Sequence, residues 1–162
     1  MKPLTISLII LLFTISLNSC SVSKEARSMK KNINGDWVLQ TITTEGITGV
    51  AKTKIFNEAD FGCFIGSNWN FIANNSMGSY TIVDKDKDCT TLKRLIRWSI
   101  YEPKDLPKQF QFKRLDDKKN SMDNGDGFRL TVIQLDKTHM KLKSEIVFSG
   151  QAGAVIYNFI KK

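Results

Sequence analysis

Residues 68–83 read NWNFIANNSMGSYTIV, and this stretch has the pattern of a β-hairpin. Two runs rich in aromatic and β-branched residues flank the turn-forming segment NNSM. Successive side chains of a β-strand point to opposite faces, so Trp69 and Phe71 share one face of the first strand. Tyr80 and Ile82 share one face of the second strand for the same reason. The stretch therefore predicts two antiparallel strands whose aromatic side chains gather on one face.

Similar strand patterns recur on both sides of this hairpin, separated by short turn-forming segments. The further strands are predicted at 35–43, 95–101, 109–115, 128–135, 140–148 and 154–160. The alternation is strict in the third of these, where Phe110 and Phe112 face opposite to Gln109 and Gln111. Residues 52–60 have a mixed period and predict one helical turn or two. The chain is therefore predicted to be all-β, with about eight or nine strands and no long helix.

The short connections between these strands favour an antiparallel up-and-down order, in which each strand pairs with the next. A sheet of this kind has two exposed edges, and closing it into a barrel removes both of them. Eight strands enclose either packed side chains or one small ligand. We therefore expect an eight-stranded barrel over residues 33–162, with a sandwich of two sheets as the alternative.

The N-terminal segment MKPLTISLIILLFTISLNSC has the features of a secretory signal. Lys2 supplies the positive charge, and the apolar run from Leu8 to Phe13 is shorter than the roughly 20 residues of a transmembrane helix. Residues 17–20, LNSC, resemble the bacterial lipobox. In proteins with that motif the cysteine becomes the N-terminus and carries lipid, which implies lipidation of Cys20. The alternative is an ordinary cleaved signal in which Cys20 has no role.

The segment after this cysteine predicts a flexible tether. Residues 21–32, SVSKEARSMKKN, are polar and charged and show no clear period. The predicted organisation is a signal peptide at 1–19, a tether at 20–32 and a barrel domain at 33–162. Because several acyl chains hold a protein stably on a membrane, we expect the lipid to anchor this protein in the cell envelope, at the outer membrane.

The net charge of +8 does not by itself indicate a nucleic-acid partner. An exported protein rarely meets nucleic acid, and the basic residues are interspersed with acidic ones, as in DKDKD at 84–88. This segment also copies the first half of a calcium-binding loop, but Cys89 and Leu95 stand where such a loop needs glycine and glutamate. We therefore expect neither nucleic acid nor calcium, while a mild attraction to anionic headgroups or polysaccharide remains open.

The chain has three cysteines. With Cys20 acylated, Cys63 and Cys89 form an even pair in an oxidising compartment, which predicts a disulfide between them. The alternative is two buried free thiols. His139 is the only histidine and no CxxC motif occurs, so neither a metal nor a redox site is expected.

The first predicted strand opens with Gly35-Asp36-Trp37, which resembles the G-x-W signature of lipocalins. The resemblance implies that Trp37 plugs one end of an eight-stranded barrel, beneath a basic side chain from near the end of the barrel. Lys161 is in phase with Tyr157 and Phe159 and is the candidate for that basic partner. Lysine stacks on aromatic rings less well than arginine does.

The middle and the end of the chain extend this resemblance to the lipocalin-like domain of exported Gram-negative lipoproteins. The similar segments are 63–64, 66–71, 74–80, 88–89, 96–98 and 156–159, so the resemblance covers about residues 32–161. The later sequence signatures of lipocalins are not recognisable. The family implies a fold and a capacity to hold an apolar molecule, and it does not imply which molecule.

No catalytic constellation stands out. No nucleophile elbow surrounds any serine, and nothing singles out a pair of carboxylates. We therefore expect no enzyme activity and no cofactor. The candidates for ligand binding are the aromatic residues of the strands: Trp69, Phe71, Tyr80, Trp98, Phe110 and Phe112.

Two functions remain open. One is a lipid-anchored barrel that binds a small hydrophobic molecule, and the other is an envelope interaction or assembly protein whose barrel is filled by the same side chains. A cavity of several hundred Å³, as is typical of ligand sites, would favour the first. The sequence leaves the oligomeric state open.

Overall fold

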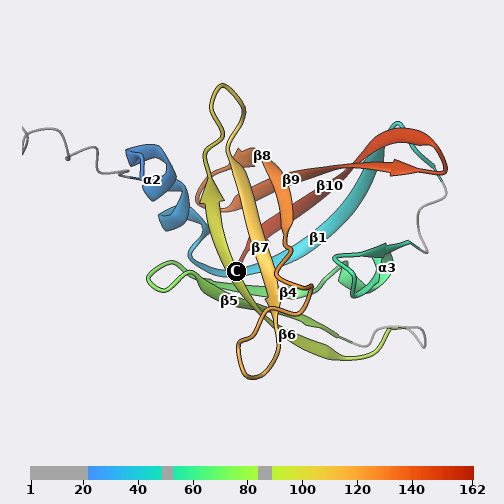
Figure 1. Cartoon of the computed structure of the whole chain (residues 1–162), viewed down its shortest axis with the longest axis horizontal. Coiled ribbons are helices and arrows are strands. Elements are labelled where there is room, and N and C mark those ends of the chain that lie inside the picture. Colours follow the sequence, from blue (N-terminus) through green and yellow to red (C-terminus); the bar gives the residue numbers. More distant parts are fainter. Residues whose placement is uncertain (1–21, 49–52, 84–88) are drawn as a thin grey trace, which may run out of the picture.

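The computed structural model describes residues 22–48, 53–83 and 89–162 (Figure 1). The predicted signal peptide at 1–19, the lipidation site Cys20 and the calcium-like segment at 84–88 lie outside the described residues.

Eight antiparallel strands form one closed barrel in the described structure. These strands are β1 (Gly35–Glu45), β4 (Asn68–Ile72), β5 (Met77–Ile82), β6 (Leu92–Tyr101), β7 (Gln109–Leu115), β8 (Phe128–Leu135), β9 (His139–Phe148) and β10 (Gln151–Lys161). From β4 to β10 each strand pairs with the next, and β1 closes the ring by pairing with both β4 and β10. The predicted up-and-down barrel is therefore confirmed, and the sandwich of two sheets is excluded.

A helix precedes the barrel, where the sequence predicted a tether. Helix α2 (Lys24–Ile33) begins after Ser23, whose Oγ accepts a hydrogen bond from the Ala26 amide at 3.0 Å. Ala26 and Ile33 are fully buried, and the helix packs on β6 and β8 at one end of the barrel. The prediction of a flexible tether over 20–32 is wrong for the helical part. Ala26 and Ile33, with the half-buried Met29 between them at helical spacing, provide the inward face of the helix despite its polar composition.

The long connection between β1 and β4 also differs from its prediction. It contains a small hairpin of β2 (Lys54–Ile55) and β3 (Ala59–Asp60), followed by the single turn α3 (Phe61–Phe64). The helical turn predicted at 52–60 is therefore displaced. The apolar residues of this connection are buried against the barrel: Ile55, Phe56 and Phe61. A hairpin allows the adjacent residues Ile55 and Phe56 both to face inward, which a helical turn would not.

Cys63 and Cys89 form a disulfide with their Cα atoms 5.4 Å apart, as predicted. The alternative of two free thiols is excluded. Closing a loop of this length contributes roughly 3–4 kcal/mol to stability in the chain-entropy account. The bond links α3 to the segment that leads into β6, and thus holds the end of the β1–β4 connection to the barrel.

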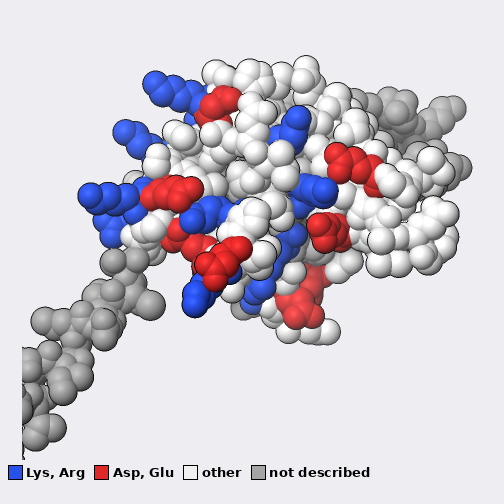
Figure 2. Space-filling view, turned by 90° about the horizontal axis from the view of Figure 1, so that it is seen from above, with Lys and Arg blue, Asp and Glu red and all other residues white. Residues whose placement is uncertain are grey.

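Charged side chains of both signs are interspersed on the face shown in Figure 2. This face shows no continuous basic surface, which agrees with the scattered charge in the sequence. None of the helices among the described residues is long and apolar enough to cross a membrane.

Candidate functional site: the mouth of the barrel

The end of the barrel next to α2 is closed by Trp37. Its indole Nε1 donates a hydrogen bond to the Ile33 carbonyl at 2.7 Å, and its side chain is fully buried. Lys161 Nζ lies 5.2 Å from the centre of the Trp37 ring and donates to the Asn32 carbonyl at 2.9 Å. Gly35 has a φ of +114°, and a Cβ there would come within 3.2 Å of Lys161 Cε. The structure thus brings together all three residues to which the sequence assigned a structural role at this end.

The six aromatic residues predicted to line a ligand site lie inside the barrel, and each is at most 2% exposed. Their rings are in continuous contact. The ring centres are 4.7 Å apart between Trp69 and Tyr80, 5.6 Å between Phe71 and Trp98, and 5.9 Å between Phe110 and Phe112. Toward α2 these rings pack against one another rather than around an empty space.

At the opposite end, the β1–β4 connection inserts one aromatic side chain into the barrel. The Phe56 ring contacts five other rings, those of Phe64, Trp69, Phe112, Phe128 and Tyr157, at centre-to-centre distances of 5.0–6.2 Å. Phe56 is only 7% exposed although it lies at the turn of a hairpin and not on a barrel strand. We call residues 53–61, which carry this ring, the lid.

The lid turn has an unusual backbone. Phe56 and Asn57 both have a φ of 52°, in the left-handed region that bulky residues rarely adopt. Such a conformation costs of order 1–3 kcal/mol and persists where the surrounding contacts enforce it. The contacts of Phe56 and of the neighbouring Glu58 supply that enforcement.

Glu58 fastens the lid to the barrel wall. Its carboxylate accepts hydrogen bonds from Tyr80 Oη at 2.6 Å, from Arg94 Nη2 at 2.8 Å and Nε at 2.9 Å, and from Arg114 Nη1 at 2.9 Å. Arg114 also donates to both carboxylate oxygens of Asp123, at 2.6 and 2.9 Å. The side chains of Glu58 and Arg114 are 9% and 8% exposed, so these ion pairs lie largely out of water. We call these five residues the latch.

The ionisation of the latch follows from this geometry. Burial by itself raises the pKa of Glu58, but the hydrogen bonds from Arg94, Tyr80 and Arg114 outweigh it and hold the pKa below the ordinary value of 4.5. Burial and the adjacent Glu58 carboxylate raise the pKa of Tyr80. At neutral pH the latch therefore contains two ionised carboxylates, Glu58 and Asp123, two arginines and the neutral phenol of Tyr80.

Among Phe56 and the five latch residues, only Tyr80 was predicted from the sequence as a site residue. Arg94 continues the inward-facing row of Ile96 and Trp98 on β6, and Arg114 continues that of Phe110 and Phe112 on β7. The alternation of these two arginines with buried residues could therefore have predicted charged side chains inside the barrel. Nothing local indicated their partner, because Glu58 is far from both in the sequence.

A pocket of about 390 Å³ opens beside the lid. It lies where β8 and β9 separate, because their ladder begins only at Thr131↔Lys143 and leaves residues 128–130 without a partner on that side. Its apolar lining includes Phe56, Phe61, Leu130, Val155 and Tyr157. Tyr157 Oη lies 3.2 Å from Ser144 Oγ and provides a polar group at this wall. Burial raises the pKa of Tyr157 to about 12.

The arrangement is suited to holding an apolar molecule. Within the described parts of the chain, no group of three or more histidine, cysteine, aspartate or glutamate side chains could hold a metal ion. His139, the first residue of β9, is exposed, and its Nδ1 lies 2.9 Å from Thr138 Oγ1.

The closed eight-stranded antiparallel barrel, with one end plugged by a tryptophan, is a lipocalin-like fold. No protein-family model matches the chain, and no curated sequence matches it either. Among solved structures it is similar to bovine odorant-binding protein in complex with a selenium-containing odorant, with 13% identity and a TM-score of 0.44 over 88% of this chain and 78% of the other. A deswapped triple mutant of bovine odorant-binding protein gives 14% identity and a TM-score of 0.40, over 81% and 74% of the two chains.

Proposed function

We propose that this protein binds a small hydrophobic molecule at the mouth of its barrel, beneath the lid, and that a lipid on Cys20 anchors it to the outer membrane. One observation carries the binding proposal. The Phe56 ring, supplied by a connection and not by the barrel wall, occupies the centre of the inward-facing aromatic rings beside a pocket of about 390 Å³.

The position of Phe56 suggests how the site works. Because the ring belongs to the lid, it can leave while every barrel strand stays paired. A ligand in place of this ring makes contacts with Trp69, Phe112 and Tyr157. Removing the apolar surface of the ligand from water contributes about 25 cal/mol per Å² to binding. The competing function, an interaction protein with a filled barrel, is favoured by the close ring packing toward α2.

Phe56→Ala tests the binding proposal. The substitution removes the internal occupant, so the uncharged fluorescent probe Nile red should bind at least about tenfold more tightly than it binds the original protein, equivalent to about 1.4 kcal/mol. The matched control is Phe110→Ala, which removes a buried ring nearer the α2 end of the barrel and should not increase probe binding.

Circular dichroism must show that both variants remain folded. Folded Phe56→Ala protein that binds no more probe than Phe110→Ala would contradict the proposed site and favour the filled barrel.

Cys20→Ala tests the anchor. Without the cysteine no lipid can be attached, so the protein should move from the membrane fraction to the soluble fraction. Ser19→Ala, which keeps a small residue before the cysteine, should leave the protein on the membrane. A Cys20→Ala protein that stays membrane-bound in high salt after removal of its signal would refute lipid anchoring.

A further inference from the structure

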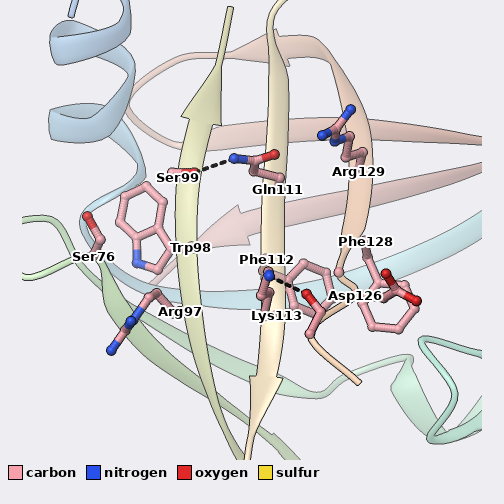
Figure 3. Close-up of a pocket in the computed structure, with 12 residues that line it drawn as sticks. Ser76, Arg97, Trp98, Ser99, Gln111, Phe112, Lys113, Asp126, Phe128 and Arg129 are labelled. Atoms are coloured by element: carbon pink, nitrogen blue, oxygen red, sulfur yellow. Dashed lines mark hydrogen bonds between the residues drawn. The ribbon is translucent and has the colours of Figure 1, made fainter. Parts of the chain in front are cut away.

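A second hollow lies outside the barrel, on the outer face of β6, β7 and β8. It has a volume of about 650 Å³ and is bounded on one side by the loop that leads into β8 (Figure 3). Gly127 in this loop passes so close to β7 that a Cβ there would meet the Phe112 carbonyl oxygen at 2.8 Å. The loop thus forms a wall and makes a groove of an otherwise flat sheet face.

Basic side chains from all three strands line this groove. Arg97 on β6 stands directly opposite Lys113 on β7, and Arg129 on β8 stands opposite Gln111. In Figure 3, Arg97 and Arg129 lie on opposite sides of β7. A fourth cation, Lys30 of α2, donates to the groove residue Ser76 at 2.8 Å.

These cations are poorly compensated within the described structure. Like charges directly opposite each other in a sheet are destabilising, and Arg97 faces Lys113 in this way. Neither Arg97 nor Arg129 forms an ion pair with a described carboxylate, whereas Arg94 and Arg114 both do. Arg129 stacks instead on Tyr101 at 4.8 Å, and Lys113 donates to the Gly125 carbonyl. Asp126 is the acidic residue of the lining.

The neutral groups of the groove are hydrogen-bonding side chains. Gln111 Nε2 donates to Ser99 Oγ at 2.8 Å, so these two residues form a polar floor between the two arginines. Guanidinium groups match the geometry of phosphate oxygens and bind them in a bidentate manner. The part of the groove that a phosphate would leave empty has this polar floor, and it suits hydroxyl groups attached to the phosphate.

We propose that this groove binds a phosphate-bearing molecule with a small polar organic part, at a site separate from the apolar mouth. The phosphate lies at Arg97 and Lys113 and relieves the repulsion between these two cations, and the polar part of the molecule lies along Ser99 and Gln111 toward Arg129. The source of the phosphate is either a soluble compound or the headgroup of a lipid. The proposal does not depend on ligand binding beneath the lid.

Calorimetric titration of the full mature protein with glycerol phosphate at physiological salt tests the proposal. We expect a Kd below about 1 mM, and a loss of about tenfold or more in the double variant R97Q/R129Q. The control is K137Q/K143Q, which removes two positive charges, one in the turn after β8 and one on β9, and should change the Kd by less than about twofold. Nile red binding should be unaffected in both.

Vesicles distinguish the two sources. Binding to phosphatidylglycerol vesicles but not to phosphatidylcholine vesicles, lost in R97Q/R129Q, assigns the site to a lipid headgroup. Binding of glycerol phosphate alone assigns it to a soluble compound. No binding of either, or an equal loss in K137Q/K143Q, overturns the proposal, because the groove would then act only through the net positive charge of the protein.

Discussion

Trp37→Ala is expected to lower the free energy of unfolding by about 3–5 kcal/mol, the usual cost of truncating a buried aromatic side chain. The whole indole is buried, and the α2 end of the barrel is closed by it. Truncation also leaves the Ile33 carbonyl without its donor and removes the surface on which Lys161 lies. Urea unfolding followed by circular dichroism measures the change.

Lys161→Met distinguishes the contribution of Lys161 to stability from that of Trp37. This variant keeps an apolar stem over Trp37 but removes the charge and the hydrogen bond to the Asn32 carbonyl, so we expect a loss of about 1–2 kcal/mol. The two variants should therefore differ clearly in urea midpoint. If Trp37→Ala unfolded at the same urea concentration as the original protein, the structural role assigned to the G-x-W segment would be wrong.

Glu58→Gln is expected to destabilise the protein by about 3 kcal/mol, because it removes the anion between two arginines in a site shielded from water. Arg114 keeps Asp123, but Arg94 loses both of its hydrogen bonds to a carboxylate. The matched control is Glu45→Gln. Glu45 is 62% exposed in its ion pair with Lys143, and loss of such a surface pair costs less than about 1 kcal/mol.

The ionisation of Glu58 also makes the stability of the latch depend on pH. The pKa of Glu58 is lower in the folded protein than its ordinary value of 4.5, so its contribution to stability is fully present above that value. The contribution is lost as the pH falls through the lowered pKa. In the original protein, Nile red binding should therefore increase in acid as the lid loosens. Glu58→Gln should lack this acid-dependent increase, and an identical pH profile in both proteins would show that the latch does not hold the lid.

Much of the barrel could be predicted because β-strands leave a local trace. The alternation at 109–115 marks Phe110 and Phe112 as inward-facing, and the segment NNSM marks the turn between β4 and β5. The pairing of Cys63 with Cys89 followed from an even number of cysteines after one was assigned to lipid. The strands and the turn could be predicted because neighbouring residues carry the alternation and the turn-forming sequence. The disulfide could be predicted because only two cysteines remained to pair.

Only the tertiary structure decided that a helix packs at one end of the barrel, which side chains enter the other end, and what lies on the outer face. Helix α2 is held by Ala26 and Ile33 against distant strands, and the polar composition around them concealed it. Glu58 meets Arg94 and Arg114 only because closure of the sheet brings β6 and β7 under the lid. The register that sets Arg97 opposite Lys113 is likewise a pairing between strands. Contacts between residues this far apart depend on how the whole chain closes, and no local pattern of residues encodes them.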